Sequence, residues 1–120
     1  MNKNIKEKWI NALISGDYKQ GKLALRQKDE FCCLGVLCDL ASKEGIVPLQ
    51  IYGDNSDKTY SYGFDEHGNQ EWQQLPPLVA QWADIDDYSG LYNSDFPSLA
   101  EANDDGCTFE EIAVIIKDNF

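Results

Sequence analysis

The sequence predicts a single α+β domain that spans residues 1–120. A run over 31–44 is apolar on almost every side, which indicates a helix buried at the centre of the domain. Segments rich in β-branched and aromatic residues lie at about 46–74, and amphipathic helical patterns occupy both ends. A length of 120 residues fits one domain with its own core.

The N-terminal pattern predicts a helix over 4–15, because its apolar residues recur at helical spacing. This helix should end at Gly16, since glycine favours the left-handed conformation that closes helices. The following residues predict a loop over 18–21 and a short strand over 22–26. The apolar face of the helix consists of Ile5, Trp9, Ala12 and Leu13.

The central helix is expected to begin after Asp29, whose side chain can cap a helix N-terminus. From Phe31 to Ala41 the run contains one charged residue, Asp39. Gly45 is placed to end the helix. A helix this apolar should be covered by the other elements of the domain.

The middle of the chain predicts a short antiparallel β region. Strand candidates lie at 46–52 and 59–64, and the residues at 53–57 have the composition of a turn. Residues 65–69 predict a hairpin tip that leads into 70–74.

The C-terminal part is predicted to be helical. Pro76 and Pro77 open a short helix whose shared face would hold Leu78, Val79 and Trp82. Two S/T-x-x-E capping boxes follow, Ser98 with Glu101 and Thr108 with Glu111. The last helix should turn four residues to the core: Phe109, Ile112, Ala113 and Ile116.

Positive charge is concentrated at the start of the chain. Seven of the ten basic residues lie in positions 1–28, whereas nineteen of the twenty-one acidic residues lie in 29–120. The net charge of −11 argues against bulk nucleic acid as a partner, but a local positive surface can attract a small anion. No apolar run reaches the ~18–20 residues of a membrane span, and no signal-peptide core is present. We therefore expect a cytoplasmic protein without a membrane partner.

The four cysteines are Cys32, Cys33, Cys38 and Cys107, and their spacing does not match that of zinc sites. His67 is the only histidine. In the cytoplasm these thiols should be reduced, and free cysteine is among the most buried residue types. We expect core packing, with no metal and no cofactor.

Three motifs follow one another along the chain: W-x-x-A-L-x-S-G-x-Y-x-Q-G over 9–21, C-C-L-G-V-L-C-D-L-A over 32–41, and L-x-x-x-N-D-x-G-x-x-F-x-x-I-A over 99–113. This order is similar to a family of small uncharacterised proteins of tailed bacteriophages and prophages. The resemblance implies a phage accessory protein, and such proteins commonly counter host defence. It implies no particular chemistry.

The segment 18–26 holds the candidate ligand-binding residues. Its basic side chains, and a glycine that lets backbone N–H groups approach a ligand, suit a phosphate-bearing anion. The N-terminus of the following helix could add its positive dipole end, and Trp72 or Tyr62 could stack on a base. In the competing interpretation the polar side chains close a turn and the basic ones are solvated. The candidates are Tyr18, Lys19, Gln20, Gly21, Lys22 and Arg26.

A papain-like cysteine hydrolase is a second hypothesis. Cys32 or Cys33 at a helix N-terminus would need a lowered pKa to act as the nucleophile, with Gln20 as oxyanion donor and His67 as base. Both thiols lie in an apolar run, however, and His67 falls in the predicted hairpin tip. The sequence therefore favours a protein that binds over one that catalyses.

A third hypothesis is an acidic inhibitor or decoy of a host defence protein, which would contact a basic partner through residues 29–120. The interpretation that we prefer is an anti-defence protein that sequesters a nucleotide-derived immune signal in the host cytoplasm. Its partner is then an anionic small molecule. The sequence leaves the oligomeric state open, a homo-oligomer included.

Overall fold

Helix α2, Cys33–Lys43, lies at the centre of the fold. The computed structural model describes residues 1–54 and 56–120, and within them eight of the eleven α2 residues are buried. The predicted central helix is confirmed, with shorter ends. Cys32 caps it in place of Asp29, because the Cys32 sulfur accepts the Gly35 N–H at 3.4 Å. Asp29 lies instead in the two-residue turn that precedes the strand holding Phe31.

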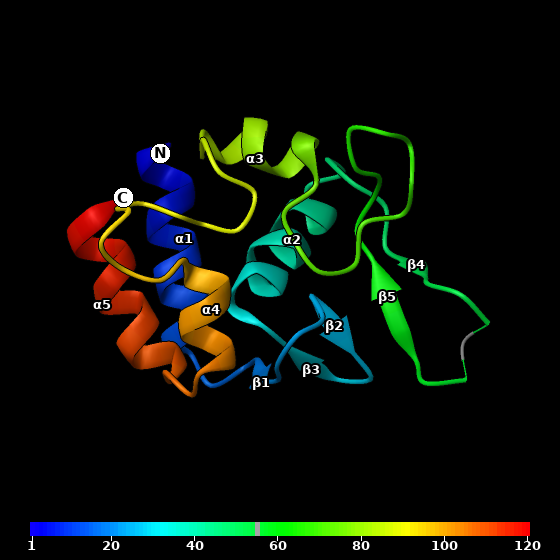
Figure 1. The fold of residues 1–120 in the computed structure, drawn as a ribbon, viewed down its shortest axis with the longest axis horizontal. Helices are drawn as coiled ribbons and strands as arrows, with labels where there is room; N and C mark the ends of the chain where they lie inside the picture. Colours follow the sequence, from blue (N-terminus) through cyan, green and yellow to red (C-terminus); the bar gives the residue numbers. More distant parts are fainter. Residues whose placement is uncertain (55) are drawn as a thin grey trace.

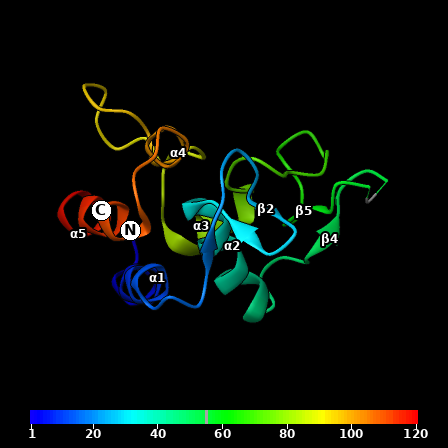
Figure 2. The ribbon, with the colours of Figure 1, turned by 90° about the horizontal axis from the view of Figure 1, so that it is seen from below.

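Three of the four further helices, α1, α3 and α4, pack on α2, and α5 packs on α1 and α4. The predicted end of α1 at Gly16 is confirmed by a φ of 82° there. Figure 1 shows α1, α4 and α5 at one end of the molecule, β4 and β5 at the other, and α2 between them, and Figure 2 shows the same division from below. The bounds are Lys3–Ile14 for α1, Pro77–Ala83 for α3, Leu99–Asp104 for α4 and Phe109–Asn119 for α5.

Five short strands form one mixed sheet in the order β1-β3-β2-β5-β4. The β1–β3 pair is parallel, and the other three pairs are antiparallel. The strands are β1 Lys19–Gln20, β2 Arg26–Gln27, β3 Glu30–Phe31, β4 Gln50–Ile51 and β5 Thr59–Ser61. Helices and a mixed sheet in one chain confirm the α+β class.

The strand predicted over 22–26 is wrong except for its last residue. Leu23 has a left-handed backbone, with φ 69°, and its N–H donates to Asp104 Oδ1 at 2.8 Å. Leu25 N donates to the Trp72 carbonyl at 2.8 Å, and Trp72 is not part of any of the five strands. These bonds bend the chain, so only Arg26 and the residue after it join the ladder.

The β region predicted over 46–74 is confirmed by β4 and β5. The hairpin tip at 65–69 is confirmed as well, because Asp65 N donates to the Asn69 carbonyl at 2.7 Å and Phe64 bridges to Gln70. In the turn predicted over 53–57, Asn55 is outside the described residues.

The C-terminal helices keep most of their predicted contacts. Thr108 and Glu111 form the full capping box, whereas at Ser98 only the first half is described, the bond from Glu101 N to the Ser98 hydroxyl. Leu78 was expected on the buried face of α3, but its side chain is 57% exposed. The four predicted core residues of α5 are all buried. Among the described helices, none is long and apolar enough to cross a membrane.

Candidate functional site

Tyr18, the first candidate ligand residue, is held against α2. Its hydroxyl donates to Asp39 Oδ2 at 2.6 Å, and the Tyr62 hydroxyl donates to Asp39 Oδ1 at 3.1 Å. Lys43 Nζ lies 3.3 Å from Asp39 Oδ2 and donates to the Tyr18 hydroxyl. The pKa of both tyrosines is raised, mainly because their hydroxyls are buried and secondly because Asp39 is close to them. Asp39, the acidic residue of the central helix, is therefore paired inside the fold with two tyrosine hydroxyls and Lys43.

Tyr62 cannot stack on a base, as the sequence had suggested, because its side chain is completely buried. Trp72, the other suggested ring, is already stacked on Tyr52 with ring centroids 5.2 Å apart. The half-exposed ring beside the basic segment is that of Tyr60, which lies opposite Arg26 in the β2–β5 ladder.

Arg26 lies between two aromatic rings. Its guanidinium carbon is 5.0 Å from the centroid of Phe31 and 4.6 Å from that of Tyr60. Its Nε donates to the Lys28 carbonyl at 2.9 Å. These contacts fix the plane of the guanidinium, and the side chain is half exposed. Arg26 is therefore a rigid, solvent-accessible cation.

Two lysines extend this positive charge along the ladder. Lys28 and Lys58 lie one position beyond the paired residues Gln27 and Thr59 at the end of the ladder. Lys28 N donates to the Lys58 carbonyl at 2.8 Å. Both lysines have left-handed backbones, with φ of 57° and 54°. Like charges at opposing positions in a ladder repel each other. We name Arg26, Lys28 and Lys58 the cationic cluster.

The cationic cluster lacks an acidic partner in the described part of the chain, because no ion pair there includes any of its three residues. The nearby Asp57 carboxylate accepts the Thr59 N–H, and Glu30 pairs with Lys19 at 3.7 Å. Sequence analysis placed Arg26 among the candidates but missed Lys28 and Lys58. The sheet register brings Lys58 to Lys28 from thirty positions along the chain.

Gln20 and Gly21 have structural contacts. The Gln20 amide bonds to three groups: Asn103 Oδ1 at 2.9 Å, the Cys107 carbonyl at 2.7 Å and the Phe109 N–H at 3.1 Å. A side chain at Gly21 would place its Cβ 2.8 Å from that of Glu30. Whether either residue also contacts a ligand stays a prediction.

Lys22 is exposed at a hollow of about 270 Å³. Its lining includes no other lysine or arginine. The Asn103 amide in its wall is already bonded to Gln20, Cys33 and Gly21. The six candidates therefore do not form one pocket: three of them line this hollow, and Arg26 belongs to the cationic cluster. The lining residues are Gln20, Gly21, Lys22, Asn103, Gly106 and Cys107.

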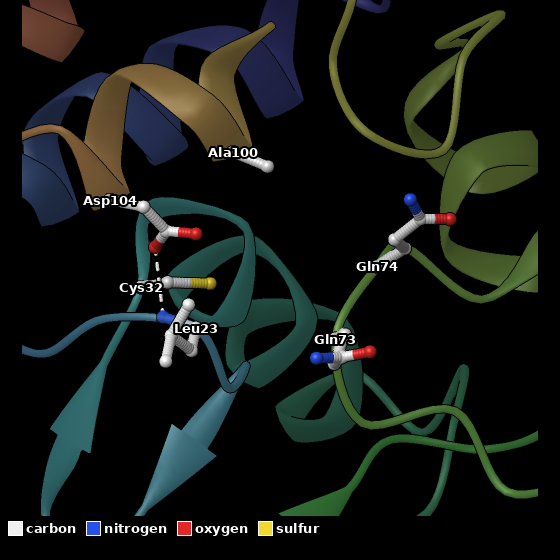
Figure 3. Close-up of a pocket in the computed structure, with 6 residues that line it drawn as sticks. All are labelled: Leu23, Cys32, Gln73, Gln74, Ala100 and Asp104. Atoms are coloured by element: carbon white, nitrogen blue, oxygen red, sulfur yellow. Dashed lines mark hydrogen bonds between the residues drawn. The ribbon is translucent and has the colours of Figure 1, made fainter.

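A second cavity, of about 190 Å³, is lined by Leu23, Cys32, Gln73, Gln74, Ala100 and Asp104 (Figure 3). The Cys32 sulfur points into it, beside the carboxylate of Asp104. Two glutamine side chains, Gln73 and Gln74, form the opposite wall. We name it the Cys32 cavity.

The thiols lack the property that a hydrolase needs. Burial raises the pKa of Cys32 to about 11 and also raises the pKa of Cys33. The hydrolase hypothesis requires a lowered pKa, and for Cys32 this prediction is wrong. Loss of solvation raises the pKa of the thiol by more than the helix N-terminus lowers it. His67 lies in the exposed hairpin tip, near Glu66. In the described residues no group of three or more His, Cys, Asp or Glu is arranged to hold a metal.

The whole chain, residues 1–120, matches a family described as a domain of unknown function, DUF8296. The chain therefore belongs to this family. No curated protein and no solved structure matches it significantly.

Proposed function

We propose that this member of the DUF8296 family binds an anionic small molecule of nucleotide type and holds it without converting it. The observation that carries the proposal is the cationic cluster: three basic residues at neighbouring positions of the β2–β5 ladder, none of them in an ion pair among the described residues. Their mutual repulsion costs stability, and a bound phosphate would relieve it.

The contacts around Arg26 suit a nucleotide. A guanidinium whose plane is already fixed loses little freedom when it forms two parallel bonds to a phosphate. Lys19 and Lys22 come from the same basic segment and remain candidate contacts for further phosphates.

The biological setting in this proposal comes from the resemblance to proteins of tailed bacteriophages and prophages. In the host cytoplasm, a protein that binds a nucleotide-derived immune signal without turnover would lower the free concentration of that signal. Binding alone is sufficient for this effect, so the proposal requires no catalytic group.

A thermal-shift screen against cyclic and ADP-ribose-type nucleotides tests the proposal. A ligand that binds only the native state raises the melting temperature by mass action. Calorimetry should then show that Arg26→Ala weakens the best nucleotide by ~1.5–3 kcal/mol, with partial recovery in Arg26→Lys. Lys8→Ala is the matched control, since Lys8 lies on α1 and pairs with Glu44 at 3.9 Å. A screen without any shift would contradict the proposal.

An acidic inhibitor of a host protein is the second candidate. Residues 59–116 contain no lysine or arginine, and Leu91 and Phe96 in this stretch are 44% and 56% exposed. An exposed apolar pair among carboxylates suits a basic partner with an apolar contact surface. A pull-down whose yield falls as salt rises, together with an empty nucleotide screen, would favour this candidate.

A further inference from the structure

The Cys32 cavity is built from four parts of the chain, one of which is α4 with Ala100 and Asp104. Leu23 comes from the bend before β2, Cys32 from the cap of α2, and Gln73 with Gln74 from the segment before α3. Figure 3 shows these side chains around one open space, closed on a further side by α4. None of the three residues of the cationic cluster lines this cavity. The cavity is therefore separate from the cationic cluster.

Its polar lining consists of one carboxylate, one thiol and two amide side chains, and each amide offers both an acceptor oxygen and N–H donors. One Asp104 oxygen accepts the Leu23 N–H at 2.8 Å, and Figure 3 shows the second oxygen directed toward the open space. The Gln73 and Gln74 side chains have no hydrogen bond to other described residues, so their amide oxygens are available. No lysine or arginine lines the cavity.

The charge of the lining selects the sign of the ligand. With one carboxylate and no cation, the cavity repels an anion and attracts a cation. Burial is the largest cause that raises the pKa of Cys32, and the negative charge of Asp104 also raises it. The field of Asp104 therefore reaches the cavity wall. A phosphate is thus excluded here, in contrast to the cationic cluster.

The shape and the apolar walls select the kind of cation. Leu23 is 65% exposed, and its bond to Asp104 holds it at the mouth of the cavity opposite the Ala100 methyl group. A flat, weakly hydrated guanidinium can lie against such apolar groups while its N–H donors reach oxygens around its edge. An ammonium group is a strongly hydrated point charge and would lose more solvation in this space.

We infer that the Cys32 cavity binds a guanidinium group, with Asp104 as its counter-ion and Gln73 and Gln74 as further acceptors. The group belongs either to a small molecule or to an arginine side chain of a protein partner. This inference does not depend on the proposed anion site, which has the opposite charge and is made of other residues.

The test is an NMR titration of the native protein with three probes, followed at the Leu23 amide and at the Gln73 and Gln74 side-chain amides. Nα-acetyl-arginine amide represents an arginine in a polypeptide, methylguanidine represents a small cation, and Nα-acetyl-citrulline amide is the neutral isostere of the first. We expect the two guanidinium probes to shift these signals with a Kd of about 1 mM or tighter. Citrulline should bind at least ~10-fold more weakly. A capped arginine that binds better than methylguanidine indicates a protein source, and the reverse order a small molecule.

The matched variants are Asp104→Asn and Asp105→Asn. Both remove one negative charge, but Asp105 does not line the cavity, and asparagine at 104 keeps an oxygen for the Leu23 N–H. Asp104→Asn should weaken the capped arginine ~10-fold or more, and Asp105→Asn less than ~2-fold. Equal binding of arginine and citrulline, equal effects of the two variants, or no shift at ~10 mM probe would overturn the inference.

Discussion

Gln20 and Asn103 hold the two ends of the chain together. Gln20 Nε2 donates to Asn103 Oδ1 at 2.9 Å, across 83 positions of sequence. Asn103 Oδ1 also accepts the Cys33 N–H, and Gln20 Oε1 accepts the Phe109 N–H. One pair of amides thus connects β1, the start of α2, the end of α4 and the start of α5.

This connection predicts that Gln20→Ala is a folding defect. The substitution leaves the buried Asn103 amide and the Phe109 N–H short of partners, so we expect a loss of about 2–4 kcal/mol in the free energy of unfolding. Urea denaturation measures it. Gln27→Ala, at an exposed strand position, should change stability by under ~0.5 kcal/mol. Unchanged stability in Gln20→Ala would show that the Gln20 amide is free to serve a ligand.

Gly35 predicts a more severe defect. A Cβ at this position of α2 would lie 1.7 Å from the Leu25 carbonyl oxygen, which is backbone and cannot move aside. We expect Gly35→Ala to cost over ~4 kcal/mol and to abolish the near-UV circular dichroism of the native protein. Gly45→Ala has open space around its Cβ and a φ of 78°, so it should cost only ~1 kcal/mol. A stable Gly35→Ala protein would mean that α2 and the bend at Leu25 are not this close.

The contacts of Gln20 and Gly35 show why the sequence predicted the helices better than it predicted the sheet or the candidate site. Helical periodicity and caps are local, so α1, α2 and α5 could be identified from patterns. Two-residue strands such as β1 are too short to show an alternating pattern. The Gln20–Asn103 bond, and the register that brings Lys58 to Lys28, depend on tertiary contacts that no local pattern contains. The signal that could have found Lys58 is its isolation, as one of two basic residues between Glu44 and Phe120.

Lys28 predicts opposite effects on stability and on binding. Its left-handed backbone is strained for any residue with a Cβ, so Lys28→Gly should raise the free energy of unfolding by about 0.5–1 kcal/mol. If Lys28 contacts the anion, the same substitution should weaken nucleotide binding. Urea denaturation and calorimetry on one preparation measure both. A more stable variant with unchanged affinity would exclude Lys28 from the site.

The raised pKa values of Tyr18 and Tyr62 predict a loss of stability in alkali. Above pH ~10, tyrosines of the unfolded chain release protons that the folded tyrosines still hold. The free energy of unfolding should therefore fall as pH rises beyond ~10. Urea denaturation between pH 8 and 11 measures the slope, and Tyr62→Phe should reduce it. A slope identical in Tyr62→Phe would show that this hydroxyl is not responsible.

The central claim is that the cationic cluster binds a phosphate-bearing anion, and pyrophosphate tests it without knowledge of the natural ligand. In an NMR titration of the native chain, we predict the largest shifts at the Lys28 and Lys58 amides and at Arg26 Nε, and their loss in the Lys28→Ala, Lys58→Ala double variant. Shifts concentrated elsewhere, at Lys22 or along α1, or no saturable shift at any of these signals, would contradict the claim.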